Sequence, residues 1–457
     1  MLQNNKYLHL VNYNTLLLWD IKRYFATQLL SQFSVVRLGD YIREESAKYK
    51  INDPTQKYGI LGVNNQIGIF DAYQEEGSKI KQKYKKMQVG WIAYNPYRIN
   101  VGSIGIRKST HNYEYISPAY VVFSCKNELL PEFLFLLMKT ELFNKIIREN
   151  TTGSVRQNLN YSVLSNLQIP LPSLAEQKNI VDAYNTKIEQ ANIYYLCSCG
   201  IDKKIEDYLH NILKTNIEFD ISGSLLNFVK YQDLSRWDPL FLLSSNNIKS
   251  KYPLTTIGQC ISHFLTDQSG KSLRRETHKT PQQEYVYIGM ENVKKETGEI
   301  VDNPIVKGKD IKSQTLYVPS KYFIYGKLRP YLNKYWYNNI EEQQKKIICS
   351  SEFFVFDIKD NVNSKYFLYV LASYIVQKQI IDAMSGARMP RISAGVFRNI
   401  QIPLPPLNIQ NEVVEHIAAL RTEQKELREK ALFLRQQATQ QFEQTIFEYN
   451  KLKTSKI

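Results

Sequence analysis

The order of apolar and polar residues follows the same course twice along the chain. Residues 33–123 and 252–356 contain short runs rich in Tyr, Ile, Val and Phe, interrupted by Gly, Asn and Pro, which predicts strands joined by loops. In residues 130–150 and 364–384, apolar side chains recur at helical spacing, which predicts helices. Each half of the chain therefore predicts a strand-rich module closed by helices.

A long helix is predicted after each of these modules, because apolar residues then recur in steps of three and four. The first seam is looser and consists of Ile180, Tyr184, Lys187, Ala191, Tyr194, Ser198, Ile201, Ile205, Tyr208 and Ile212. The second consists of Ile417, Leu420, Gln424, Leu427, Ala431, Leu434, Ala438, Gln441 and Thr445. Each helix covers about 40 residues, or roughly 60 Å. Paired with each other, the two helices form a coiled coil in which polar seam residues fix the register.

An internal repeat underlies this pattern. Its opening signature is displaced by 218 positions (229 minus 11) and pairs Val11, Tyr13, Leu16, Trp19 and Asp20 with Val229, Tyr231, Leu234, Trp237 and Asp238. Further along, YNPYR at 94–98 faces YGKLR at 325–329. We interpret Trp19 and Trp237 as core residues, because they belong to the shared frame.

The most similar block closes each half. QIPLP at 168–172 matches QIPLP at 401–405, and Gln177 and Gln410 follow at the same distance. Gly153 and Gly386 precede this block and are expected in backbone turns. The displacement is now 233, so about 15 residues (233 minus 218) are added in the middle of the second half. Similar ends and divergent middles are expected of two modules that read different targets.

Composition adds a partner class to this picture. The chain has 59 Lys+Arg against 44 Asp+Glu and a net charge of +15, a balance that suits a polyanion such as nucleic acid. The N-terminal LLLWDIKRYF is too short to span a bilayer and has no cleavage site, so we expect a cytoplasmic protein without membrane contact. The five cysteines are interpreted as free thiols rather than metal ligands.

The two IPLP blocks, the two WD-containing starts and the two heptad helices together resemble the specificity subunit of Type I restriction-modification systems. The resemblance covers nearly the whole chain. It implies an α+β fold with two pseudo-repeated α/β target recognition domains, separated by two long antiparallel coiled-coil spacer helices. The boundaries expected are 1–173 for the first recognition domain, 174–215 for its helix, 216–406 for the second domain and 407–450 for its helix.

The same resemblance implies a division of labour. Each recognition domain reads one half of a bipartite duplex-DNA target, the helices set the gap, and two methyltransferase (modification) subunits pack on the helices. Restriction and translocase subunits join for cleavage. S-adenosylmethionine and ATP are bound by those partners, so no cofactor is expected in this chain. Segment 155–160, VRQNLN, departs from the usual form, whereas 388–393, RMPRIS, is closer to it.

The chemistry of an enzyme is not evident. Asn95-Pro96-Tyr97 resembles a fragment of an adenine-methyltransferase motif but lacks one Pro and a Gly-rich partner, and Gly270-Lys271-Ser272 lacks the first glycine of a phosphate-binding loop. We therefore predict a non-catalytic subunit. Two alternatives stay open, a coiled-coil nucleic-acid scaffold and the specificity partner of a related defence system.

Basic residues beside aromatic ones are the candidates for DNA contact, because Lys and Arg neutralise phosphates and Arg also pairs with guanine edges. The first module supplies Lys83, Lys85, Lys86, Arg98, Arg107 and Lys108, and the second supplies Lys271, Arg274, Arg275, Lys327, Arg329, Arg388 and Arg391. A solvated charge run is the alternative for 79–86. For Arg98 and Arg329, which recur at equivalent positions, the alternative is a salt bridge within the shared scaffold.

Overall fold

A computed structural model describes residues 29–151, 158–218, 247–265, 281–302, 304–311, 314–340, 345–384, 386 and 388–447. The chain divides into two compact units, one of residues 1–195 with 428–457 and one of residues 196–427. Each unit thus contains one module, the start of the long helix that follows it, and the end of the other long helix. The WD signatures, with Trp19 and Trp237, lie outside the described residues.

In the first unit a four-stranded sheet packs against two short helices. Its strands, in spatial order, are β2 (Ile42–Glu44), β10 (Val121–Cys125), β7 (Ile92–Tyr94) and β8 (Ile104–Ile106), paired antiparallel. The helices are α1 (Pro131–Lys139) and α2 (Glu141–Asn150). Fully buried Tyr94, Phe123, Phe133 and Phe143 form the centre of this core. The helical spacing in 130–150 correctly predicted these helices, with a break at Thr140.

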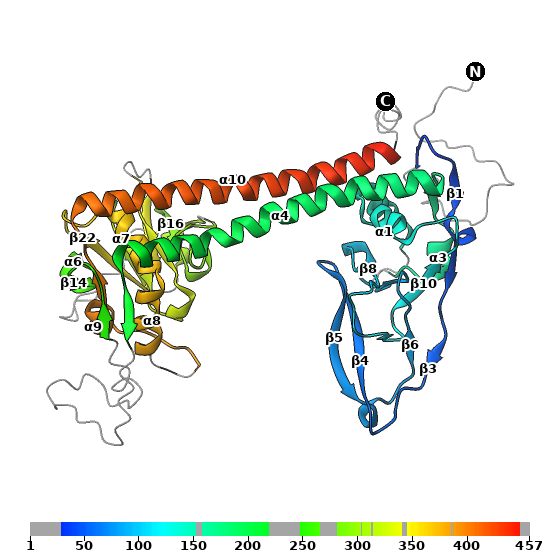
Figure 1. The fold of residues 1–457 in the computed structure, drawn as a ribbon, viewed down its shortest axis with the longest axis horizontal. Coiled ribbons are helices and arrows are strands. Elements are labelled where there is room, and N and C mark those ends of the chain that lie inside the picture. The colour runs from blue at the N-terminus through cyan, green and yellow to red at the C-terminus, as the bar shows by residue number, and fades with distance from the viewer. Residues whose placement is uncertain are drawn as a thin grey trace. The chain divides into compact units, whose positions relative to one another are not determined.

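The second unit repeats this arrangement, with more aromatic side chains in its core. Its sheet has the order β15 (Ile261–Phe264), β22 (Phe353–Ile358), β19 (Phe323–Gly326) and β20 (Tyr335–Tyr337). Helices α7 (Ser364–Ala372) and α8 (Tyr374–Ala383), labelled with β22 in Figure 1, cover it. Phe323 and Phe356 stack at 5.6 Å between ring centroids, and Phe367 meets Phe323 edge-on. Aromatic packing of this kind stabilises a core beyond the area that it buries.

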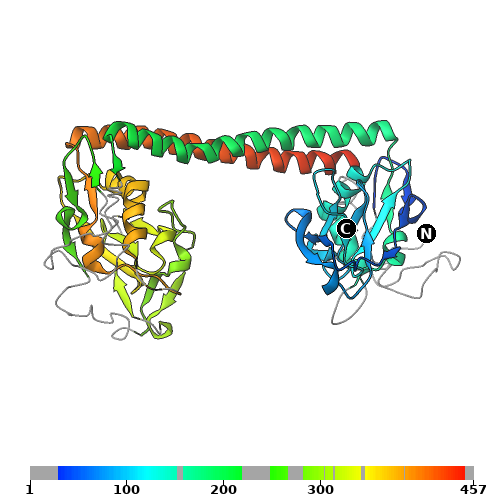
Figure 2. The ribbon, with the colours of Figure 1, turned by 60° about the horizontal axis from the view of Figure 1, so that its bottom comes forward.

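A second sheet completes each module, and its order is the same in both. In the first unit it is β5 (Gly68–Glu76), β4 (Lys57–Asn64), β9 (Tyr115–Ile116), β6 (Tyr84–Lys86) and β3 (Lys48–Tyr49). In the second it is β17 (Ile305–Lys307), β16 (Glu284–Ile288), β21 (Lys346–Ser350) and β18 (Thr315–Tyr317). These strands belong to the yellow-green to yellow part of the ribbon in Figure 2. The central pairs β4–β9 and β16–β21 are both parallel. Only β3 has no counterpart among the described strands of the second unit.

The QIPLP blocks form strands that close each module onto its own beginning. Strand β11 (Gln168–Pro170) pairs with β1 (Val35–Arg37), and β23 (Gln401–Pro403) pairs with β14 (Leu254–Thr256) in the same register. The short helices α3 (Tyr161–Ser165), α6 (Ile257–Cys260) and α9 (Ala394–Asn399) lie next to these strands in sequence. Gly386 has a φ of +102°, a backbone conformation that glycine adopts without penalty, whereas Gly153 lies outside the described residues.

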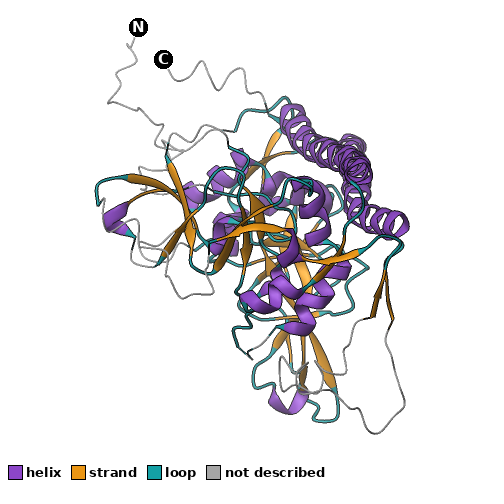
Figure 3. Cartoon of the chain, turned by 90° about the vertical axis from the view of Figure 1, so that its left-hand side faces the viewer, coloured by secondary structure: helices purple, strands orange, loops and turns teal. Residues whose placement is uncertain are grey.

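The two predicted long helices are α4 (Leu174–Leu213) and α10 (Leu407–Ile446), and they pack together (Figure 3). Strands β12 (Asn216–Glu218) and β13 (Asn247–Lys249) form an antiparallel pair after α4. All ten predicted seam positions of α4 are at least half-buried. The prediction for α10 is wrong at its end, because Gln441 is exposed and Phe442 is buried beside Tyr184 instead. No described helix is both long and apolar enough to cross a bilayer.

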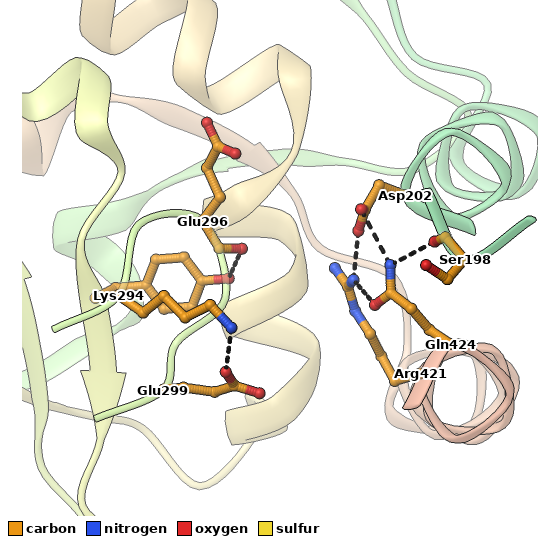
Figure 4. Close-up of polar contacts among 8 residues, drawn as sticks. Ser198, Asp202, Lys294, Glu296, Glu299, Arg421 and Gln424 are labelled. Atoms are coloured by element: carbon orange, nitrogen blue, oxygen red, sulfur yellow. Dashed lines mark hydrogen bonds and ion pairs between the residues drawn. The ribbon is translucent and has the colours of Figure 1, made fainter. Parts of the chain in front are cut away.

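The seam of the second unit contains a polar layer (Figure 4). Gln424 is buried, and its Nε2 donates to the Ser198 carbonyl and to the Asp202 carboxylate, each at 3.0 Å. The Gln424 Oε1 accepts a hydrogen bond from Arg421, which also pairs with Asp202. In the first unit the seam has Ala191 and Ala431 buried instead. A single satisfied polar layer of this kind fixes the register of a helix pair.

Candidate nucleic-acid interface

The loop after the third strand of the four-stranded sheet is the same place in both modules, and it carries an exposed arginine each time. Arg98 follows β7 and Arg329 follows β19, and each directly precedes a 3-10 turn, residues Ile99–Val101 and Pro330–Leu332 respectively. Within the residues that the structure describes, neither guanidinium forms a hydrogen bond or ion pair. An exposed, unpaired arginine is a suitable group for contacting phosphate or a guanine edge.

An exposed tyrosine accompanies each arginine. Tyr97 is 55% exposed beside Arg98, and Tyr331 is 43% exposed two residues after Arg329. Sequence reasoning did not single out these tyrosines, although the order Tyr-Arg in one loop and Arg-Pro-Tyr in the other was readable. Aromatic rings and arginines in one loop are typical of nucleic-acid contact surfaces.

In the second module the structure brings a second basic segment to this loop. The Arg329 amide donates to the Pro390 carbonyl at 2.7 Å, and the Ile392 amide donates to the Lys327 carbonyl at 3.1 Å. These bonds place exposed Arg388 and Met389, the latter 54% exposed, on the segment that adjoins the Arg329 loop. The sequence separates these two segments by about 60 residues, so their proximity was not predictable from spacing.

Lys327 and Arg391 share this region, but Arg391 pairs with Glu352 and the Lys327 ammonium lies over an aromatic ring. Arg391 forms a two-pronged ion pair with the Glu352 carboxylate, at 3.2 Å from Nε and 3.1 Å from Nη2. The Lys327 ammonium lies 5.3 Å from the centre of the Phe354 ring. Burial lowers the pKa of Lys327, and the nearby Glu352 carboxylate partly offsets this effect. Both residues therefore shape the loop, whereas Arg329 and Arg388 have no ion-pair partner among the residues that the structure describes.

The lysines of the 79–86 stretch lie on the other sheet of the first module, around β6. Lys83 is exposed, and Lys86 pairs with Glu114 at 3.0 Å. Lys85 is 5% exposed, and its ammonium donates to the Tyr120 carbonyl at 2.9 Å. Burial lowers the pKa of Lys85. Lys85 thus stabilises the fold, and of the three predicted contacts in this stretch only Lys83 has no hydrogen bond or ion pair among the described residues.

Arg107 also has a scaffold role. Its Nε donates to the Tyr113 carbonyl at 3.0 Å and its Nη1 to the Met87 carbonyl at 2.6 Å. These bonds tie the end of β8 to segments that flank β6 and β9. Lys108, the next residue, is exposed. The three remaining candidates, Lys271, Arg274 and Arg275, lie outside the described residues.

The fragment that resembles a methyltransferase motif is a turn. The Asn95 side-chain oxygen accepts a hydrogen bond from the Tyr97 amide at 3.0 Å, and the Pro96 carbonyl accepts one from the Leu159 amide. Such a side chain to backbone bond is the usual role of Asn in a turn. Among the described residues, no group of three or more His, Cys, Asp or Glu side chains is arranged to hold a metal ion.

Comparison with known proteins places both modules in one family. The family model described as the type I restriction modification DNA specificity domain matches the chain twice, at residues 32–193 and 260–432. Each match includes one module and the beginning of the helix that follows it. Together they cover well over half of the chain.

The chain is also similar to individual proteins. The chain is 22% identical over 326 residues to the Type I restriction enzyme EcoDI specificity subunit of Escherichia coli, covering 70% of this chain and 68% of that protein. A structure described as the basis of complex assembly and conformational transition of the type I R-M system has a TM-score of 0.56 at 14% identity, covering 92% of this chain and 98% of its own. The HsdS subunit from Thermoanaerobacter tengcongensis has a TM-score of 0.43 at 14% identity, with 90% and 96% covered.

Proposed function

The chain belongs to the type I restriction modification DNA specificity family, and from this premise we propose that its two modules read the two halves of a split duplex-DNA target. It is the non-catalytic specificity subunit of such a system. The reading surface that we propose for each module is the loop with Arg98 and Tyr97, or with Arg329 and Tyr331. In the second module Arg388 adjoins it.

The observation that supports this proposal is the recurrence of the same loop on two modules whose other surfaces differ. A structural salt bridge was the alternative for Arg98 and Arg329, but neither pairs with a carboxylate of the described residues. Exposed cations that do not stabilise the fold are available for a ligand, and a polyanion suits a chain of net charge +15. The exposed Lys83 and Lys108 are proposed phosphate contacts. Lys271, Arg274 and Arg275, which lie outside the described residues, are proposed for the same role.

We propose that methyltransferase subunits dock on the long helices. In the first unit α4 exposes Ile193 and Tyr195, at 60% and 47%, and α10 exposes Leu432 and Phe433, at 57% and 61%. Large apolar side chains at this exposure are typical of a protein–protein contact. The structure with a TM-score of 0.56 concerns complex assembly in a type I system. We therefore propose a modification subunit as the partner of this surface. S-adenosylmethionine would be bound by that subunit.

The wider assembly follows from the family. We propose that two modification subunits bind one copy of this chain, that restriction and translocase subunits using ATP join them, and that the complex acts on DNA in the cytoplasm. The coiled-coil scaffold alternative loses support, because a scaffold does not require equivalent exposed arginines on two modules. A related defence system with other catalytic subunits stays open.

The test is to co-express the chain with the adenine methyltransferase encoded beside its gene and to map methylated adenines in the host DNA. We expect a split motif with a fixed gap. Arg98→Ala should make one half of the motif degenerate and Arg329→Ala the other, since one arginine–guanine pair discriminates by roughly 1–3 kcal/mol. Lys430→Ala, which removes an exposed charge of α10, is the control and should leave both halves intact. Methylation without a split motif would contradict the proposal.

A further inference from the structure

We propose that Gln377 is a positioning residue for DNA reading by the second module, because it holds Asn333 and with it the loop of Arg329 in a left-handed backbone conformation. This inference rests on the proposed function and adds to it a residue that touches no DNA itself. Three features support it: the backbone conformation of the loop, the hydrogen bonds of Gln377 and the exposure of Arg329.

The loop has left-handed residues at both ends. Arg329, before the 3-10 turn, has φ 48° and ψ 58°, and Asn333, after it, has φ 44° and ψ 56°. Asparagine tolerates this region, but for arginine it is costly and persists only where the surroundings enforce it. Strained residues of this kind concentrate at functional sites.

The first module builds the equivalent turn without this strain. Arg98 has φ −133°, and the turn ends at Gly102 with φ 83°, where glycine has no penalty. The left-handed arginine is therefore a property of the second module and not of the shared frame. Its surroundings should contain a contact that the first module lacks.

Gln377 supplies that contact. Its Nε2 lies 3.0 Å from the Asn333 Oδ1, 2.8 Å from the Leu371 carbonyl and 3.4 Å from the Tyr325 hydroxyl. Asn333 is 3% exposed, so its amide is fixed in place, and α8 packs against the 3-10 turn. The equivalent residue of the first module (377 minus 233) is Asn144, which is one methylene shorter, and its buried Oδ1 has no hydrogen-bond partner in the structure.

The Gln377–Asn333 hydrogen bond matters for Arg329 because the Arg329 side chain has no bonding partner among the described residues. Arg329 is exposed and makes no side-chain bond to any described residue, so the direction of its guanidinium is set by the loop backbone alone. Its amide is fixed by Pro390 on one side, and Asn333 is fixed by Gln377 on the other. Without Gln377 the loop can relax towards ordinary φ values, and Arg329 and Tyr331 would lose their orientation.

The test compares two glutamines of the same helix in the co-expressed complex. Gln377→Ala should make one half of the methylated motif degenerate, with a roughly 5-fold loss of discrimination, the size expected for one hydrogen bond. The half affected should be the one that Arg329→Ala affects. Gln379→Ala is the matched control, because Gln379 also binds backbone, at Ile375 and Gln401, but does not contact the loop. It should leave both halves of the motif intact.

Two further variants protect the test against a folding defect. Gln377→Asn keeps the amide but is one methylene too short to reach Asn333, so it should reproduce the loss of discrimination with a smaller drop in melting temperature than Gln377→Ala. The double variant Gln377→Ala with Asn333→Ala should be no worse than Asn333→Ala alone, since the two side chains act as one unit.

The outcomes separate the two proposals. An intact motif in both Gln377 variants, or degeneracy in both halves, would overturn this inference and leave the proposed function standing. A wild-type complex that methylates no split motif would overturn both.

Discussion

Two buried glutamines make the same hydrogen bonds in the two modules. The Gln177 Oε1 accepts from the Leu130 amide, and its Nε2 donates to the carbonyls of Glu128 and Pro172. Gln410 binds the Asn363 amide and the carbonyls of Asn361 and Pro405 in the same way. Each glutamine thus joins the start of a long helix to the loop before α1 or α7 and to the IPLP block.

Gln177→Ala and Gln410→Ala should each destabilise the protein. Either change leaves a backbone amide and two carbonyls without a partner in a site that is at most 1% exposed, and the expected loss is about 2–4 kcal/mol in the free energy of unfolding. Urea unfolding followed by circular dichroism measures it. Gln190→Ala, on the exposed face of α4, is the control and should change little. Equal stability of all three variants would show that these bonds contribute nothing.

The sequence indicated which residue types contact DNA but not which individual side chains are free to do so. Lys85 and Arg107 lie in basic, aromatic stretches, yet both bend back onto backbone carbonyls. Arg391 is engaged by Glu352, which is 39 residues away in sequence. Long flexible side chains find such partners only in the folded chain. Arg98 and Arg329 could be selected from the sequence because they occupy equivalent positions of the internal repeat.

At the scale of elements, each module is fastened to the long helix that follows the other module. The Glu206 side chain of α4 accepts a hydrogen bond from the Tyr374 amide at the start of α8, and Glu443 of α10 does the same for Glu141 at the start of α2. A carboxylate at a helix N-terminus satisfies an unpaired amide and interacts favourably with the helix dipole. Each module is thus bound to a long helix by the same contact, a glutamate that accepts a hydrogen bond from a helix N-terminus.

Glu206 makes this contact pH-dependent. Burial raises the pKa of its carboxyl above the ordinary value of 4.5, and the hydrogen bond from Tyr374 and the charge of His210 only partly offset this. The folded protein therefore holds the proton at a pH where the unfolded chain has lost it. The contribution of Glu206 to stability is largest below pH 4.5 and is lost as the pH rises through the raised value.

Glu206→Gln should remove this dependence while keeping the oxygen that accepts the hydrogen bond. We expect the stability of the wild type relative to this variant to fall as the pH rises above 4.5. Glu206→Ala should lose roughly 1 kcal/mol, the usual effect of a lost cap. Thermal unfolding at several pH values measures both, with exposed Glu415→Gln as the control for charge removal. A constant difference between wild type and Glu206→Gln would contradict the assignment.

The elements themselves were largely readable. Helical spacing predicted both short helix pairs and both long helices. The sheets were predicted only as strand-rich segments, because the parallel pairs β4–β9 and β16–β21 join strands about 50 residues or more apart. Local patterns carry no information on such pairing. The predicted seam is wrong at Gln441 because Phe442, the next residue, is the one that packs into the core of the first module.

At the scale of the whole molecule, the beginning of each module is hydrogen-bonded to the end of the long helix that follows the other module. The Ser31 hydroxyl donates to the Ile446 carbonyl at the end of α10, and Ser250 donates to the Leu213 carbonyl at the end of α4. The residues correspond through the repeat (250 minus 31 is 219, and 446 minus 213 is 233). The end of each helix therefore meets the beginning of a module in the same way, although only α4 leads into its module along the chain.

Lengthening both helices should change the gap of the target but not the bases that the two modules read. Seven residues inserted after Tyr195 and after Leu427, the boundaries of the two compact units, preserve the heptad seam and add about 10.5 Å to each helix. At about 3.4 Å per base pair this corresponds to a gap longer by about three base pairs. The bases of the two half-sites should stay the same, because the loops of Arg98 and Arg329 lie far from the insertions in sequence.

Mapping of methylated adenines in the co-expressed complex measures both properties at once. Slower methylation is expected, since three base pairs also rotate one half-site relative to the other by roughly 100°, whereas a heptad insertion turns an α-helix back by only about 20°. The control is an insertion in α4 alone, which shifts the seam of one helix against the other and should abolish methylation. An unchanged gap in the double insertion would mean that the helices do not set the distance between the half-sites, and altered bases would mean that they take part in reading them.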